Sequence, residues 1–133
     1  MELKELRLTD LQPSQFYISE KKLEAISNWF RPADLTGFEP IPVKMLDGLP
    51  AMTDGHTRAV AALRAGLDRV PLAWEADELS WDMYSRCVEE CRKRRVFSPA
   101  DLLDRILTEA EYDEKWNRWC DAMQAEVKAV SGA

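Results

Sequence analysis

Apolar residues follow a helical spacing in one early stretch of the chain. This pattern predicts a helix at residues 20–30, with Ser19 as a suitable N-cap before it and Arg31-Pro32 as a stop behind it. One face of the helix collects four apolar residues: Leu23, Ile26, Trp29 and Phe30. The stretches on either side have a different spacing, so this helix is expected within a region of short strands.

Runs typical of strands occupy four places before residue 75: 3–8 (LKELRL), 42–46 (PVKML), 50–53 (PAMT) and 70–74 (VPLAW). Asp47-Gly48 lies between the middle two and supplies the positive φ angles of a tight turn, which predicts a hairpin over 42–53. Pro71 favours an edge position or a strand beginning for the last run, because proline cannot donate a ladder hydrogen bond. We therefore expect a small mixed sheet.

Helical spacing dominates after Trp74. An alanine-rich helix at residues 57–65, ended by Gly66, precedes this change. Three further helices are predicted, with their N-terminal capping residues: 80–95 (Ser80), 98–107 (Ser98-Pro99) and 108–130 (a capping box of Thr108 and Glu111). The order of elements predicts an α+β fold, with an α+β core over residues 1–76 and a helical extension over 77–133 packed on it. A length of 133 residues fits a single unit of this kind.

Charge and hydropathy exclude some classes of protein. The 18 basic and 24 acidic residues give a net charge of −6 and a pI near 4.9, which argues against a protein that binds nucleic acid by general phosphate neutralisation. The basic run at 92–95 (RKRR) is interpreted as the charged last turn of a helix. No apolar run approaches the roughly 18 residues of a membrane span, and the N-terminus lacks a secretory stretch, so we expect a cytoplasmic location and no membrane contact.

The three cysteines predict neither disulfides nor a metal site. Cys87, Cys91 and Cys120 occur in a chain with no export sequence, where reduced, buried thiols are the usual state. The chain contains a single histidine, so four zinc ligands would have to include carboxylates. We therefore assign no metal ligands from the sequence.

The segment at residues 53–58 (TDGHTR) combines polar groups that suit an anion site between a predicted strand and a predicted helix. The first turn of a helix exposes backbone N–H groups, Gly55 lets a ligand approach the backbone, and Arg58 can donate two hydrogen bonds to a phosphate or carboxylate. His56 could donate a proton near neutral pH, and Asp54 could accept a substrate proton or help to hold Mg²⁺.

A purely structural interpretation of the same segment stays open. In that case Asp54 or Thr57 only caps the helix, and Arg58 pairs with an acid on the surface. Both interpretations place the residues at a turn between two elements, where binding sites are common. The residue types alone do not choose between them.

The neighbouring sequence resembles the N-terminal domain of the ParB and sulfiredoxin-like superfamily. The resemblance lies in PIPV at 40–43, the predicted hairpin, and DGHTRAVAALRAGLDRVPLAW at 54–74, and it extends upstream to LTDLQPSQ at 8–15. It covers about residues 6–74, and it is greatest to small bacterial proteins with a ParB-like nuclease domain. It implies a small mixed sheet of ParB N-terminal or sulfiredoxin type, followed here by a C-terminal helical subdomain.

The resemblance also separates the activities of the superfamily. Sulfiredoxins use a cysteine inside Gly-Cys-His-Arg, and His56 stands at that cysteine's position, which argues against this activity. Partition ParB proteins bind CTP through Gly-Glu-Arg-Arg and continue into a DNA-reading helix-turn-helix; the segment differs here and the helical half is acidic, so DNA binding is not expected. Free-serine kinases carry Asp-Gly-x-His-Arg, which Asp54, Gly55 and Arg58 match, but Gln15 replaces their catalytic glutamate.

The function implied is a ParB-like domain that binds a nucleotide or another phosphate-bearing ligand, as a sensor. ATP, ADP or CTP, with or without Mg²⁺, are the expected ligands. The expected contacts are these: Gly55, His56, Thr57, Arg58 and, from a closing early loop, Gln15. One alternative is a small-molecule kinase of the free-serine type, a nucleotide-dependent phosphotransferase with Asp54 and His56 as catalytic residues. Others are a protein-interaction module with a vestigial site, whose C-terminal helices bind a protein partner, and a DNA-associated ParB-like protein.

Overall fold

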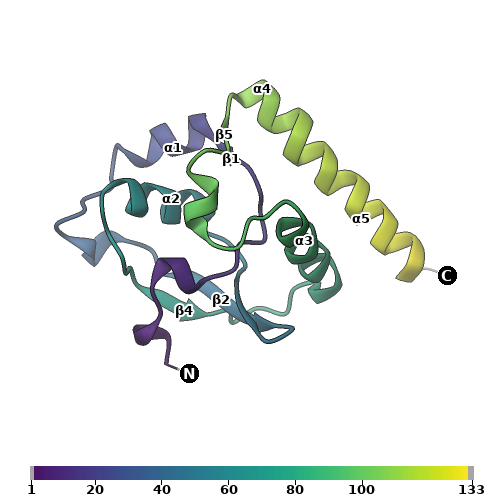
Figure 1. Cartoon of the computed structure of the whole chain (residues 1–133), viewed down its shortest axis with the longest axis horizontal. Helices are drawn as coiled ribbons and strands as arrows, with labels where there is room; N and C mark the ends of the chain where they lie inside the picture. The colour runs from purple at the N-terminus through teal and green to yellow at the C-terminus, as the bar shows by residue number, and fades with distance from the viewer. Residues whose placement is uncertain (1, 132–133) are drawn as a thin grey trace.

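The backbone of residues 2–131, described by a computed structural model, is a mixed α+β arrangement of two small sheets and several helices (Figure 1). The strands are β1 (Ile18–Ser19), β2 (Ile41–Leu46), β3 (Leu49–Met52), β4 (Leu72–Trp74) and β5 (Ile106–Leu107). The helices are α1 (Glu20–Ile26), α2 (His56–Arg64), α3 (Trp81–Lys93), α4 (Glu109–Tyr112) and α5 (Arg118–Ser131). Short 3₁₀ turns and one π-helical turn complete the chain: η1 (Leu3–Glu5), η2 (Leu8–Asp10), η3 (Leu35–Gly37), η4 (Pro99–Leu102) and the π-helical η5 (Asp113–Asn117).

The predicted hairpin and mixed sheet are confirmed. Strands β2 and β3 pair antiparallel with Val43 opposite Met52, and β4 joins β2 in parallel, giving the order β3-β2-β4. Asp47 and Gly48 both have positive φ angles, 51° and 81°, as a two-residue hairpin turn requires. Strand β4, which begins directly after Pro71, lies at an edge of the sheet, as expected.

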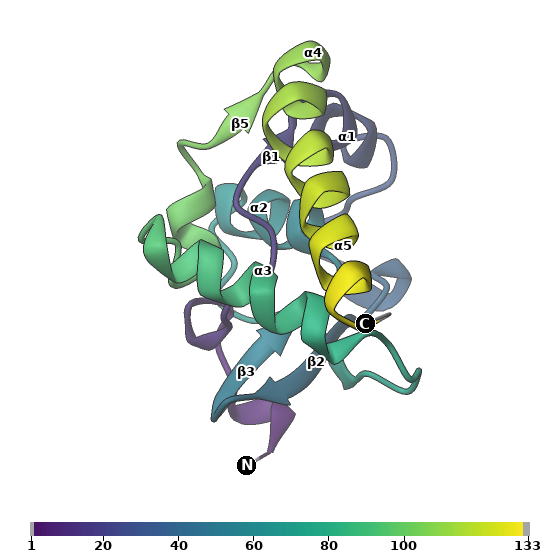
Figure 2. The same cartoon turned by 90° about the vertical axis from the view of Figure 1, so that its right-hand side faces the viewer.

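Helix α2 lies at the centre of the molecule, between the sheet and the helical half (Figure 1). Its Ala59 and Ala62 pack with the sheet residues Ile41 and Val43 in one buried cluster. Its Val60 belongs to a second buried cluster, shared with residues of α3 and of the chain around β1 and β5. Figure 2 shows α5 running along one side of the molecule, where it contacts α3. Helix α2 is therefore packed on two sides.

Local capping residues begin the helices as predicted, except at α3. The Ser19 hydroxyl accepts a hydrogen bond from the backbone N–H of Lys22. The Thr108 hydroxyl accepts from the backbone N–H of Glu111 and donates to the Glu111 carboxylate, so Thr108 caps α4, but the reciprocal backbone bond of the predicted capping box is absent among the described residues. Ser80 precedes α3, but its side chain makes no capping hydrogen bond. The last predicted helix forms from α4 to α5, with a π-helical turn at Asp113–Asn117 inside it.

Three predictions are wrong. Residues 3–8 form no strand. They begin with a 3₁₀ turn in which the N–H of Leu6 donates to the carbonyl of Leu3. This turn packs Leu3 and Leu6 against the core, so no strand is needed to bury them. Helix α1 ends at Ile26 rather than at residue 30. The N–H groups of residues 27–29 bond to the carbonyls three positions earlier, as in a 3₁₀ turn, and not to those four positions earlier.

The predicted helix over 98–107 is also wrong. Ser98 and Asp101 cap a 3₁₀ turn as a capping box, but this turn ends at Leu102. Residues 106–107 then become β5, which pairs in parallel with β1 through Ile18 and Ile106. This pairing partner lies almost ninety positions away in the chain, so the local pattern could not show it.

Candidate functional site

The turn between β3 and α2 is built around Gly55. Its φ of 81° is the left-handed region that favours glycine, and a Cβ there would lie 2.9 Å from Arg58 Nη2 and 3.1 Å from Ile41 Cγ1. The exposed Asp54 caps the turn, since its Oδ1 accepts a hydrogen bond from the Gly55 N–H at 2.8 Å. No other residue type fits at position 55 without moving its neighbours.

His56 is the first residue of α2 and is buried, with 4% of its surface exposed. Its Nε2 accepts a hydrogen bond from the Ser14 N–H at 2.9 Å, which assigns the ring proton to Nδ1. The pKa of His56 is lowered to about 4, mainly by burial; the nearby Asp54 carboxylate opposes this shift and Arg58 adds to it. The ring is therefore neutral at pH 7: its Nδ1–H is available as a hydrogen-bond donor, but the ring is not the acidic group expected from the sequence.

The early loop is fastened along β3. The N–H and carbonyl of Gln12 bond to Pro50 and Met52 of that strand, and the Ser14 hydroxyl donates to the Met52 carbonyl at 2.6 Å. Gln15 uses its amide nitrogen on the Tyr17 carbonyl and the Tyr112 hydroxyl. This loop therefore lies beside the start of α2 without any closing movement.

A cavity of about 220 Å³ lies where this loop, the turn and the helical half meet. The loop and turn contribute these lining residues: Ser14, Gln15, Thr53, Asp54 and His56. The helical half contributes the following: Ser80, Met83, Tyr84, Cys87, Trp116, Cys120, Met123 and Gln124. Sequence reasoning missed this second wall, because an apolar helix face has the same pattern whether it lines a cavity or a core.

The helical wall carries neutral groups. The Tyr84 hydroxyl donates to the Thr53 carbonyl at 3.1 Å, and its pKa is raised, first by burial and then by Asp54 and other nearby groups. Burial raises the pKa of Cys87 to about 11 and that of Cys120 to about 12. Neither thiol is a nucleophilic thiolate at neutral pH.

Arg58 does not line this cavity. Its guanidinium donates to the carbonyl oxygens of Glu39 and Pro40, lies 3.9 Å from the Glu39 carboxylate, and leaves only 13% of the side chain exposed. Thr57 and Gly55 also lie outside the cavity wall. The structure thus brings Asp54, His56 and Gln15 to one cavity and turns Arg58 toward the start of β2. No lysine or arginine lines this cavity among residues 2–131.

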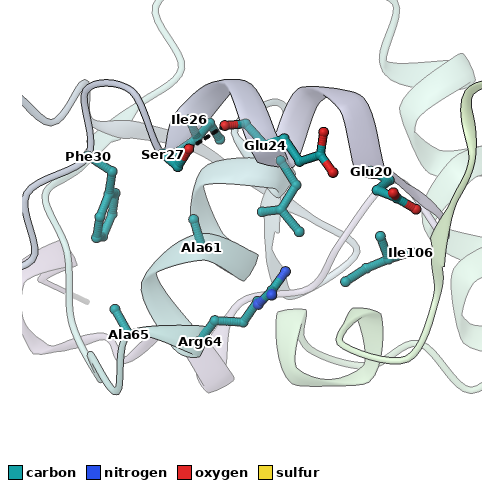
Figure 3. Close-up of a pocket in the computed structure, with 10 residues that line it drawn as sticks. Glu20, Glu24, Ile26, Ser27, Phe30, Ala61, Arg64, Ala65 and Ile106 are labelled. Atoms are coloured by element: carbon teal, nitrogen blue, oxygen red, sulfur yellow. Dashed lines mark hydrogen bonds between the residues drawn. The ribbon is translucent and has the colours of Figure 1, made fainter.

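A larger cavity of about 740 Å³ lies elsewhere, between α1 and α2 (Figure 3). Its walls are mostly apolar, with Glu20, Glu24 and Arg64 at the sides. In the described part of the chain these three side chains form no ion pair. None of the site residues expected from the sequence lines this groove, so it is separate from the candidate site.

Comparisons with protein-family models, curated proteins and solved structures find no match to this chain. Residues 2–131 contain no group of three or more His, Cys, Asp or Glu side chains placed to hold a metal ion. Within the same range, no helix combines the length and apolar character needed to cross a bilayer. The candidate site therefore has to be interpreted from its own geometry.

Proposed function

We propose that this chain is a binding domain of ParB/sulfiredoxin type that takes a phosphate-bearing ligand, with nucleotides foremost, at the start of α2. The observation that carries the proposal is His56, a buried side chain that lines the 220 Å³ cavity and uses only one of its two ring nitrogens within the described residues. No buried side-chain nitrogen or oxygen among residues 2–131 lacks a hydrogen-bond partner, so the unbonded Nδ1 is accessible from the cavity, where a ligand can accept from it.

Backbone donors also occur at the start of α2, the helix whose first residue lines this cavity. The N–H groups of His56, Thr57 and Arg58 begin a nine-residue helix and have no acceptor within residues 2–131. They carry the positive end of the helix dipole, which favours an anion there. A phosphoryl group is therefore the ligand part that we place at this turn.

The size of the cavity limits what enters it. A volume of about 220 Å³ holds a phosphate with a small part of its ester, while typical sites for larger ligands begin at roughly 300 Å³. The rest of a nucleotide would extend past the exposed Asp54, whose Oδ2 makes no hydrogen bond in the described structure. Asp54 is then placed to hold Mg²⁺ beside the phosphates. Arg58 supports the turn from behind rather than contacting the ligand.

A thermal-shift experiment tests this proposal. The panel is ATP, ADP, CTP, GTP and inorganic phosphate, each with and without Mg²⁺, and the matching nucleosides are the controls. A ligand at about a hundred times its Kd should raise the Tm by about 8 °C. The His56→Gln variant can keep an acceptor for the Ser14 N–H but loses the Nδ1 donor, so it should lose most of this shift. An equal shift in both proteins, or none in the wild type, would contradict the proposal.

A second candidate, phosphoryl transfer to a small hydroxyl compound, rests on Asp54. This residue is the one carboxylate on the wall of the cavity in the described structure. Gln15 cannot accept a proton, and the Nε2 of His56 is occupied, so Asp54 would be the general base. Turnover of ATP with free serine that disappears in Asp54→Asn, with the Tm unchanged, would distinguish an enzyme from a sensor.

A further inference from the structure

A different cavity, of about 420 Å³, lies at the C-terminal end of α3, where three arginines meet. Its lining residues come from the end of α3 and from the segment before β5: Arg94, Arg95, Val96, Ala100, Asp101, Leu103, Asp104 and Arg105. Residues on the start of α2 do not contribute to it. This cavity is therefore separate from the site of the proposed function.

Two of the arginines are held in fixed positions by groups of the chain. Arg94 donates from Nε to the Glu90 carboxylate at 3.2 Å, and its guanidinium lies 4.1 Å from the centre of the Phe16 ring. Arg105 donates from Nε to the Phe16 carbonyl at 2.6 Å and lies 4.5 Å from the centre of the Tyr17 ring. In both cases the two terminal nitrogens have no partner within residues 2–131.

These terminal nitrogens are the pair that binds an oxyanion in the bidentate manner. Because Nε and the flat face of each guanidinium are already engaged, a ligand would not have to order either side chain. Preorganised donors of this kind bind more tightly than mobile ones. A charged last turn that only complements the α3 dipole does not require such fixed positions.

Arg95 adds a third guanidinium in an unfavourable backbone conformation. Its φ is 65°, and the N–H of Val96 bonds back to the Cys91 carbonyl at 2.8 Å, as in a helix end that usually has glycine. The Arg95 side chain makes no hydrogen bond or ion pair with any described residue. No side-chain hydrogen bond or ion pair with residues 2–131 therefore compensates for placing an arginine there.

We infer that this cavity binds a phosphate monoester of a small hydroxylated molecule, such as a sugar phosphate. The phosphate would lie among the guanidinium groups of Arg94, Arg95 and Arg105. The Asp101 Oδ2 accepts from the N–H groups of residues 97 and 98, whereas Asp104 makes no hydrogen bond in the described structure and can accept from ligand hydroxyls. The volume exceeds that of bare phosphate, and a net positive wall favours a dianion.

Calorimetric titration of the full chain with ribose 5-phosphate, inorganic phosphate and ribose tests the inference. The sugar phosphate should bind, phosphate should bind more weakly, and ribose should not bind. Arg95→Gly should weaken sugar-phosphate binding about tenfold, as expected for the loss of a charged hydrogen bond, while the Tm rises. Asp47→Gly is the matched control, because Asp47 also has a positive φ but belongs to the β2–β3 hairpin and does not line this cavity; it should leave the affinity unchanged.

Other outcomes overturn the inference. Equal affinity in the wild type and in Arg95→Gly would remove the arginine cavity as the binding site. Loss of binding in His56→Gln would move the phosphate to the start of α2, which supports the proposed function and rejects this second site. Binding of a single-stranded oligonucleotide without any binding of ribose 5-phosphate would assign the arginines to a nucleic-acid backbone instead of a small ligand.

Discussion

The turn before α2 and the turn after α3 both contain a residue with a left-handed backbone conformation, but the two turns use different residue types for it. Each has one residue with a positive φ, Gly55 at 81° and Arg95 at 65°. At the first turn the residue is a glycine, and the arginine three positions on is folded back against it. At the second turn the positive φ belongs to the arginine itself, whose side chain extends to an open cavity.

This difference shows that the presence of charged residues in a segment does not make them available to a ligand. Arg58, in the segment with the most suggestive sequence, already binds two carbonyl oxygens of its own chain. Arg95, in a run that charge arguments assign to a helix end, has no partner among residues 2–131. At the start of α2, the available donors are instead a neutral imidazole and the backbone N–H groups.

The largest effect should come from adding a methyl group at the first turn. Gly55→Ala places a Cβ within 2.9 Å of Arg58 and keeps a positive φ, so we expect a loss of about 3 kcal/mol in the free energy of unfolding. Gly48→Ala is the matched control: its φ is also 81°, but nothing lies within 4 Å of the added Cβ, and the loss should be about 1 kcal/mol. Urea unfolding measures both values. Equal losses would show that the close contact at Gly55 is unimportant.

The buried His56 should make stability depend on pH. Its pKa is about 4 in the folded state and 6.5 when unfolded, so the unfolded chain binds one more proton between these values. The contribution of the neutral His56 ring to the free energy of unfolding is fully present above pH 6.5, and it falls as the pH drops toward 4. The loss should be roughly 2 kcal/mol at pH 5. Carboxylates also titrate in this range, so the quantity to measure is the difference between wild type and His56→Gln from pH 7.5 to 4.5. A constant difference would mean that the ring is accessible to protons in the folded state.

Elements with local causes could be predicted from the sequence. Asp47-Gly48 determines the hairpin through its own φ angles, and Ser19 and Thr108 cap helices within three residues. The strand pair β1–β5 could not be predicted, because Ile18 and Ile106 each belong to a two-residue strand with no pattern of its own. Short strands of this kind exist only through the tertiary partner.

The candidate site could be predicted only in part, for the same reason. Asp54 and His56 lie two positions apart at a turn that the sequence locates, and Gln15 lines the same cavity because its loop follows β3. The position of Arg58 depends on the backbone carbonyl oxygens of residues 39 and 40, which accept its hydrogen bonds. A pattern of side chains in the sequence does not show which backbone carbonyls lack a donor. The helical wall depends on how α3 and α5 pack, which also involves residues far apart in the sequence.

Removing the Arg58 side chain should have an intermediate effect. Arg58→Ala leaves the carbonyl oxygens of Glu39 and Pro40 without this donor, and we expect a loss of about 1–2 kcal/mol in unfolding free energy. Arg64→Ala is a control on the same helix, because Arg64 is exposed and has no ion pair in the described structure; the change should stay within about 0.5 kcal/mol. Chemical denaturation of the two variants compares them directly. Similar values would indicate that Arg58 contributes little to holding β2.

The smallest effect should be a gain. Arg95→Gly relieves a positive φ of 65°, but glycine also loses more freedom on folding, so the net gain should be about 0.5–1 kcal/mol. Asp47→Gly should gain less, because aspartate tolerates the left-handed region better than arginine does. Urea midpoints of both variants give the two gains. If Arg95→Gly is instead less stable than the wild type, the Arg95 side chain stabilises the folded chain through its own contacts. The contrast between an arginine engaged by the fold and one left free for a ligand would then fail at this turn.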